Sequence, residues 1–357
     1  MNCFKPSIVS GIIFCIRELR NYTGYRTDLV WCDSLPEILI LDGSTLEELL
    51  KPEILIDEIA NAFKLYSEGK TVTPSRTVMY VEGNWWGIMQ SYVPGYGVGV
   101  KIVNVIPANR QRGLPTIQAL VTLFDPVTGT PLAVLEGSVL TGLRTAAATA
   151  ASAKYMAPKE PGAIAVIGTG YQARYQLRFI ASIFKPEEVR IYDVRKEALE
   201  SYEKFVKSLG YEVYKAKDPV DAVRNARIVV EATTTENPVV FGDALEPPVH
   251  VISIGAHTPN ARALDDAVIK KAEVIVVDSR KAVLEETGDI RIPLEKGLIK
   301  MEDIAELGEV VAGKKPGRLG NGITVFKSVG LAIQDACTAG LVYRLAKEKS
   351  RGFSIKI

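Results

Sequence analysis

From residue 163 onward, short apolar segments alternate with segments of helical periodicity, and this alternation constrains the fold more than any other feature of the chain. Short apolar runs are typical of strands buried on both faces, and helical crossovers between such strands are typical of parallel pairing. We predict strands at 163–167, 189–192, 212–214, 228–232, 250–254 and 274–277, with helices at 172–184, 196–208, 218–226 and 265–271. The pattern predicts an α/β fold with a doubly wound parallel sheet of the Rossmann type.

The preceding part of the chain has a different pattern. An apolar stripe at helical spacing follows Pro52, which suits the first turn of a helix, and Gly69 ends it. Further helices are predicted at 138–156 and in the region 325–345, which we expect to pack back onto this part. Turn sequences separate short predicted strands at 38–41, 77–81, 87–92, 98–106, 119–124 and 132–135. We therefore expect a mostly antiparallel α+β domain before the parallel sheet.

The composition limits the partners that the chain can have. Lys plus Arg (43) and Asp plus Glu (42) nearly cancel over 357 residues, so no net field directs the chain to nucleic acid or an anionic membrane. The cysteines include no C-x-x-C pair and only two histidines are present, so we expect no metal site and no disulfide framework. The apolar run at 8–16 is too short to span a bilayer, and no cleavage site follows it. These features favour a cytoplasmic protein.

The turn Gly168-Thr169-Gly170-Tyr171-Gln172-Ala173 follows the predicted strand AIAVI and opens a helix. In such a turn Gly168 allows the tight bend and Gly170 lets a pyrophosphate approach the backbone. Ala173 then allows close packing of the helix on the strand, and the free N–H groups at the helix N-terminus hold the anion. The context predicts a dinucleotide site; the alternative is an ordinary strand–turn–helix without a ligand.

The next predicted strand ends at Asp193, where a carboxylate can accept a hydrogen bond from a ribose hydroxyl. A carboxylate repels a 2′-phosphate, so Asp193 favours NAD. Arg195, two residues further on, can offset that repulsion, and NADP therefore stays open as an alternative cofactor.

Three basic residues occupy positions where a core residue is expected. Lys101 lies within the strand pattern GVGVKIVNV, Arg144 is the only charge in SVLTGLRTAAATAASA, and Arg76 leads into an apolar strand. Buried cations need partners, so they either converge on a substrate carboxylate or form internal salt bridges. His257 follows the fifth predicted strand, at the edge where ligands bind in this fold. It is a candidate proton donor, or else a loop histidine that touches cofactor or solvent.

Several linked segments resemble the ornithine cyclodeaminase/μ-crystallin family over nearly all of residues 38–345. They are Met89–Tyr92, Gly97–Asn109 (GVGVKIVNVIPAN), Leu140–Tyr155 (LTGLRTAAATAASAKY), Val166–Ala173 (VIGTGYQA) and Ser328-Val329-Gly330. Each segment alone is common, but the combination is specific. The resemblance covers both the parallel-sheet part and the part that precedes it.

The resemblance implies a homodimer with three regions in each chain: an extension of unknown role (1–36), a substrate-binding and dimerisation domain (37–156 with 320–357), and an inserted Rossmann NAD(P)-binding domain (157–319). It also implies that Arg76, Lys101 and Arg144 bind the substrate carboxylate and that Met89 lines the pocket. Positions that match dinucleotide contacts in the family are Thr116, Arg144, Tyr171, Gln172, Asp193, Thr233, Ile254, Gly255, Ala256, His257 and Ser328.

Two departures from the family pattern concern the reaction. Ornithine cyclodeaminases carry an Asp where this chain has His257, and an acidic residue two positions before the pocket Met, where this chain has Gly87. Without those carboxylates we expect an NAD(P)-dependent oxidoreductase of a small α-imino or α-amino acid, of the ketimine reductase or alanine dehydrogenase type. Lys101 or His257 would supply the proton. The alternatives are an ornithine cyclodeaminase and a dinucleotide-binding protein without turnover.

Overall fold

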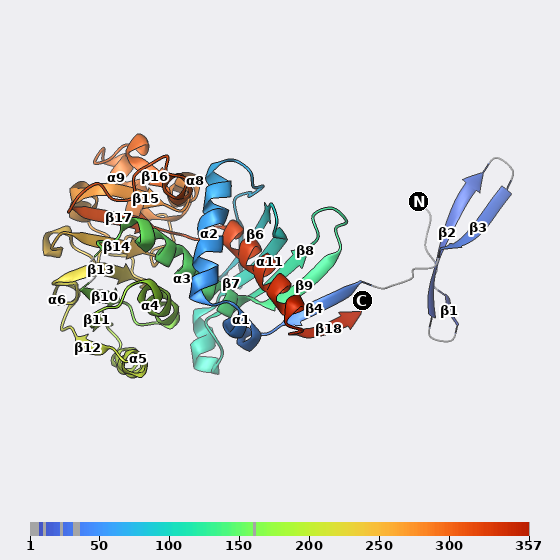
Figure 1. Ribbon diagram of the computed structural model, residues 1–357, viewed down its shortest axis with the longest axis horizontal. Coiled ribbons are helices and arrows are strands. Elements are labelled where there is room, and N and C mark those ends of the chain that lie inside the picture. Colours follow the sequence, from blue (N-terminus) through green and yellow to red (C-terminus); the bar gives the residue numbers. More distant parts are fainter. Residues whose placement is uncertain (1–6, 10–11, 22–23, 31–35, 160–161, 357) are drawn as a thin grey trace.

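The computed structural model describes residues 7–9, 12–21, 24–30, 36–159 and 162–356 of the chain. Two large sheets make up most of it and lie side by side in Figure 1. Within the N-terminal extension, β1 (Ser7–Val9), β2 (Ile12–Asn21) and β3 (Gly24–Val30) pair antiparallel in a separate small sheet. In the described part of the chain, no helix has both the length and the hydropathy needed to cross a membrane.

The sheet nearer the N-terminus has seven strands. All neighbouring strands pair antiparallel except β4 and β9, which are parallel, as the α+β prediction requires. In sheet order the strands are β18 (Phe353–Lys356), β4 (Glu37–Leu41), β9 (Pro131–Glu136), β8 (Ile117–Phe124), β7 (Gly97–Val105), β6 (Asn84–Val93) and β5 (Thr77–Val81). A short 3₁₀ helix, η1 (Pro107–Arg112), lies between β7 and β8.

Four helices belong with this sheet: α1 (Gly43–Leu49), α2 (Pro52–Ser67), α3 (Gly137–Met156) and α11 (Ala332–Glu348). Helix α11 packs over β6 and β7 and against α2 and α3. Since successive side chains of a strand point to opposite faces, Lys101 on β7 points to the helix side and is buried, whereas Ile102 is exposed on the other face. The alternation therefore places a lysine in the interior, as its sequence context predicted.

The second sheet has eight strands, and every pair is parallel. Strand order reverses between β10 and β13, so the carboxyl edge beside them is the expected ligand position in a doubly wound sheet. In sheet order the strands are β12 (Glu212–Lys215), β11 (Glu188–Tyr192), β10 (Ala163–Ile167), β13 (Ala226–Glu231), β14 (Val249–Ser253), β17 (Ile323–Lys327), β15 (Ala272–Val277) and β16 (Ile304–Glu306).

The helices of this half are mostly amphipathic and cover the sheet. Asp218 caps α6 and Pro219 starts it, as predicted, although the helix ends earlier than expected, at Val223. The helices are α4 (Tyr171–Ile183), α5 (Lys196–Ser208), α6 (Pro219–Val223), α7 (Asp266–Lys271), α8 (Arg280–Glu286), α9 (Gly288–Glu295) and α10 (Leu307–Val311), with 3₁₀ turns η2 (Gly242–Ala244) and η3 (Met301–Asp303).

Strand β17 corrects two predictions. The region 325–345 was expected to be helical throughout and to belong, from residue 320, with the first domain. Instead, β17 inserts between β14 and β15 of the parallel sheet, and only α11 packs on the first sheet. The sheet thus has two strands, β16 and β17, beyond the predicted six. A short apolar run such as Val325-Phe326 fits a buried helix or a buried strand equally well by periodicity, which explains the error.

Helix α10 packs against α2 and so joins the two halves close to the backbone. A Cβ added at Gly308 would overlap the carbonyl group of Phe63, whereas at Gly320 the nearest atom would be 3.5 Å away. We expect Gly308→Ala to lower the free energy of unfolding by about 1–3 kcal/mol through overpacking. Gly320→Ala is the control and should change it little. Thermal and urea denaturation measure both; equal stability of the two variants would contradict this account of the contact.

Candidate active site

The turn after β10 has the geometry that its glycines predict. Gly168 has φ +86°, and a Cβ there would lie 2.6 Å from the carbonyl oxygen of Ala232, so only glycine fits. At Gly170, the N-cap of α4, no described atom lies within 4 Å of an added Cβ. Ala173 is buried beneath α4 and its carbonyl accepts from the Tyr202 hydroxyl at 2.9 Å. The backbone of the turn is therefore open on the side where an anion would approach.

The start of α4 has unused polar groups that fit a dinucleotide pyrophosphate. Among the described residues no side chain caps its first N–H groups. The Oε1 atom of Gln172 is buried without a hydrogen-bond partner in this part of the structure. Tyr171 is half exposed beside them, and its hydroxyl lies 3.2 Å from that of Tyr175. Free N–H groups at a helix N-terminus bind phosphate, so these residues fit the predicted cofactor.

Asp193 lies beside the turn, at the end of β11. Its Oδ2 accepts from the backbone N–H and hydroxyl of Thr169 at 2.8 and 3.0 Å, and its Oδ1 accepts from the Arg195 backbone at 2.9 Å. Burial alone would raise the pKa of Asp193, but the hydrogen bonds from Arg195 and Thr169 outweigh it, so the pKa lies below its ordinary value. The carboxylate is thus ionised and held at the position where a ribose is expected.

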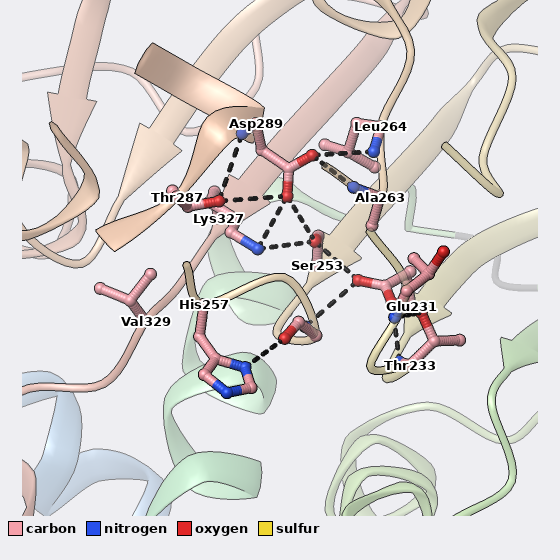
Figure 2. Close-up of polar contacts among 12 residues, drawn as sticks. Glu231, Thr233, Ser253, His257, Ala263, Leu264, Thr287, Asp289, Lys327 and Val329 are labelled. Atoms are coloured by element: carbon pink, nitrogen blue, oxygen red, sulfur yellow. Dashed lines mark hydrogen bonds and ion pairs between the residues drawn. The ribbon is translucent and has the colours of Figure 1, made fainter. Parts of the chain in front are cut away.

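Other predicted cofactor residues lie at the same edge of the parallel sheet. Thr233 follows β13, residues 254–257 follow β14, and Ser328 follows β17. His257 is exposed, and its Nδ1 lies 2.7 Å from the Gly255 carbonyl oxygen (Figure 2). Ser328 is buried and donates its hydroxyl proton to Asp278 at 2.8 Å. Parallel strands bring these segments together although they are far apart in the sequence.

Thr116 lies elsewhere. It comes just before β8 of the other sheet, and its carbonyl accepts from the Ile106 backbone at 2.8 Å. Within the described residues, no hydrogen bond or ion pair links Thr116 to the edge of the parallel sheet. Its predicted contact with a dinucleotide therefore stays a prediction.

Two of the predicted substrate-binding cations meet at one carboxylate. The Lys101 Nζ lies 2.8 Å from Oδ1 of Asp335, and the Arg144 Nε lies 3.2 Å from the same oxygen. Arg144 also donates to Gln334 at 2.9 Å. The three charged side chains are almost fully buried, and together they carry a positive excess of one charge. A buried positive excess is costly unless an anion completes it, which fits a substrate carboxylate.

The environment of Lys101 also changes its acidity. Burial lowers the pKa of Lys101 from its ordinary value to about 7, the charge of Arg144 lowers it further, and Asp335 opposes both. A lysine with such a pKa can hold or release a proton near neutral pH.

Arg76 lies at a cavity between the two halves of the chain. Its Nη2 donates to the carbonyl oxygens of Val329 and Gly330 at 3.0 and 2.7 Å, and its Nε lies 2.8 Å from Glu286. Burial raises the pKa of Glu286 to about 7, against the lowering effect of Arg76. The cavity is lined by Tyr66, Thr73, Pro74, Ser75, Arg76, Met89, Ser279, Lys281, Ala282, Glu285, Glu286, Gly330, Leu331 and Ala332. Arg76 and Met89 thus line a pocket as predicted, while Lys101 and Arg144 lie outside its lining.

Comparison with known proteins settles the family. The family model for the ornithine cyclodeaminase/mu-crystallin family matches residues 37–350. The chain belongs to this family. A Delta(1)-pyrroline-2-carboxylate reductase of Bacillus cereus is 38% identical over 325 residues, which are 89% of this chain and 100% of the relative.

Two solved structures of the ornithine cyclodeaminase/mu-crystallin fold resemble this chain closely. The Thermococcus litoralis Delta(1)-pyrroline-2-carboxylate reductase in complex with NADH and L-proline has a TM-score of 0.85 and 38% identity, covering 89% of this chain and 100% of that one. An archaeal alanine dehydrogenase dimer with bound NAD has a TM-score of 0.84 and 37% identity, covering 90% and 99%.

Two residues of the site in this family member were missed by the sequence analysis. Asp335 is the only acidic residue between Ile323 and Ala346, and a lone carboxylate in an apolar helix indicates a buried cation nearby. Glu286 gave no such signal, because it follows Glu285 on a helix that looks solvated. Only the packing of the two halves brings it to Arg76.

The acidity of Lys101 leads to a pH prediction. In the reductive direction Lys101 must be protonated, so kcat/KM should fall as pH rises above about 7. Asp335→Asn removes the charge that raises the pKa of Lys101, so it should move this limb to lower pH. Glu286→Gln should leave the limb in place. Steady-state kinetics across pH test this; a limb that is unmoved in Asp335→Asn would exclude Lys101 as the titrating acid.

Proposed function

We propose that this protein is an NAD(P)-dependent oxidoreductase of a small α-imino or α-amino acid. The observation that carries the proposal is the buried positive excess at Lys101, Arg144 and Asp335, in a chain that also has a dinucleotide-type turn. The family relatives named above, a pyrroline-2-carboxylate reductase and an alanine dehydrogenase, support the same class of reaction. Metal ligation has no part in the proposal.

The chain's own cations bind and orient the substrate. Arg76 offers a guanidinium at the cavity, and Arg144 and Lys101 supply buried positive charge behind it. A carboxylate bound by an Arg fork has a fixed plane, so the adjacent imine carbon and nitrogen are oriented as well. To bind there, the substrate carboxylate competes with Glu286 for Arg76 and with Asp335 for the other two cations.

The cofactor would be held by Gly168, Gly170, Gln172, Asp193 and the residues that follow β13, β14 and β17. When bound, reduced nicotinamide supplies a hydride to a carbon. Lys101 Nζ supplies or holds the proton for the nitrogen, since its pKa is close to neutral. His257 is the second candidate for this role, because it follows β14 at the same edge as the dinucleotide turn.

The pocket favours a compact substrate. An added Cβ at Gly87 would lie 2.5 Å from the ring of Trp85, so the indole takes the space that a longer side chain at 87 would need. Trp85 packs with Met89, Val103 and Ala332 in a small apolar cluster next to the pocket. Glu285 and Glu286 in the cavity wall are the observation that favours the second candidate, a lyase acting on a diamino acid such as ornithine.

A homodimer and a cytoplasmic location are part of the proposal. The outer face of the seven-stranded sheet exposes apolar side chains, among them Met79, Ile102 and Leu120, which are 41%, 44% and 49% exposed. Exposed apolar patches of this kind mark interaction surfaces, and an archaeal relative forms a dimer. The domain made of 37–156 and α11 would make that contact. The scattered cysteines fit a reducing compartment.

The central test is a substrate screen. With NADH or NADPH, absorbance at the nicotinamide band should fall when pyrroline-2-carboxylate, or pyruvate with ammonium, is added, because the carboxylate clamp needs only a small α-imino acid. The absorbance change with cofactor alone is the control. Release of ammonia from ornithine without net oxidation of NADH would instead favour the lyase. Cofactor binding without either reaction would favour a protein that only binds the dinucleotide.

Cofactor preference is expected to depend on Asp193. In Asp193→Asn the repulsion of a 2′-phosphate is lost while Arg195 stays, so the ratio of kcat/KM for NADPH over NADH should rise by roughly tenfold or more. The matched control is Asp193→Asn with Arg195→Ala, in which most of the gain should be lost. Kinetics with both cofactors give the ratio, and an unchanged ratio in the single variant would contradict the role of Asp193.

A further inference from the structure

A second buried charged network lies at the carboxyl edge of the parallel sheet, apart from the substrate cations. Glu231 ends β13, Ser253 ends β14, Lys327 ends β17 and Asp289 lies in the first turn of α9. All four are fully buried. Figure 2 shows them converging behind the loop that carries His257.

The hydrogen bonds form a chain from one carboxylate to the other. The Lys327 Nζ lies 2.8 Å from Asp289 Oδ2 and donates to the Ser253 hydroxyl oxygen at 3.1 Å. The Ser253 hydroxyl has one proton, and its contact with Glu231 Oε2 (2.8 Å) is shorter than that with Asp289 Oδ2 (3.4 Å). The ammonium therefore binds Asp289 directly and Glu231 through the serine.

The two carboxylates hold backbone N–H groups of the loops at this edge. Glu231 accepts from the N–H groups of Thr233 and Gly255 at 2.7 and 3.2 Å. Asp289 accepts from those of Ala263 and Leu264 at 2.7 and 2.8 Å. An added Cβ at Gly255 would overlap the Thr233 carbonyl, so these loops also pack directly on each other. Two successive loops are thus fixed by one connected set of charges.

We propose that Lys327 is a positioning residue that fixes the loops at Thr233 and at Gly255–His257 for the nicotinamide half of the cofactor. The inference rests on the proposed function, since it assumes a dinucleotide at this edge. The pyrophosphate and adenosine half belong to the Gly168 turn and Asp193, on the β10–β11 side, whereas the network lies under β13, β14 and β17. Loss of Lys327 should therefore affect one half of the cofactor and spare the other.

The electrostatics explain why a cation is needed. In the described part of the chain, Lys327 is the only cationic side chain that contacts this network. Without it, two buried carboxylates would face each other across Ser253 with no positive charge, a costly arrangement. The carboxylates would then take up protons or move, and their bonds to the loop N–H groups would weaken.

The test compares the dissociation constants of NADH and of ADP-ribose, which lacks the nicotinamide. In the wild type, NADH should bind more tightly. In Lys327→Met, the constant for NADH should rise about tenfold while that for ADP-ribose changes little. Ser253→Ala, which keeps the Lys327–Asp289 pair, should shift the same ratio in the same direction and covers the case in which Lys327→Met does not fold.

Thr324→Val is the matched control. Thr324 lies on the same strand, is fully buried and lies 2.9 Å from His250 Nδ1, away from the carboxyl edge. It should lower the melting temperature without changing the ratio of the two constants. Equal loss of NADH and ADP-ribose affinity, or an unchanged ratio in Ser253→Ala, would overturn the positioning role. Failure of the wild type to bind either ligand would instead overturn the proposed function.

Discussion

The segment from Ser328 to Asp335 crosses from one sheet to the other, and the arrangement of the site depends on its anchors. At its start, the carboxylate of Asp278 accepts from the N–H groups of Val329 and Gly330, both at 2.7 Å. At its end, Asp335 pairs with Lys101 of the seven-stranded sheet. A single short crossing thus fixes the cofactor edge relative to the buried cations. Hydride transfer requires such fixed relative placement, because small misplacements cost large factors in rate.

Charge balance separates the two buried lysines of this chain. Lys101 shares its carboxylate with Arg144, so its cluster has a positive excess that an anionic substrate can complete. Lys327 lies between Asp289 and, through a serine, Glu231, so its cluster has a negative excess. That excess is satisfied by backbone N–H groups and leaves no unmet demand for a ligand. Both lysines are buried, yet only the first has the electrostatics of a binding site.

The sequence was sufficient for the parallel sheet, the phosphate turn and the buried position of Lys101, because each depends on local pattern. It was insufficient for β17, whose short apolar run suits a helix or a strand, and for Glu286, which reaches Arg76 only through packing between the two halves. Asp335 lies between these cases. As a lone acid in an apolar helix it could have been identified, but its partners could not have been named without the fold.

The Arg76–Glu286 pair connects substrate binding to the contact between the halves. Arg76 precedes β5 of the seven-stranded sheet, and Glu286 ends α8 of the other half, so their 2.8 Å contact closes the cavity from both sides. A substrate carboxylate that binds Arg76 displaces Glu286 as its partner. Since burial raises the pKa of Glu286 to about 7, the released side chain can become neutral near physiological pH. The cavity can therefore exchange one carboxylate for another without leaving an unpaired buried charge.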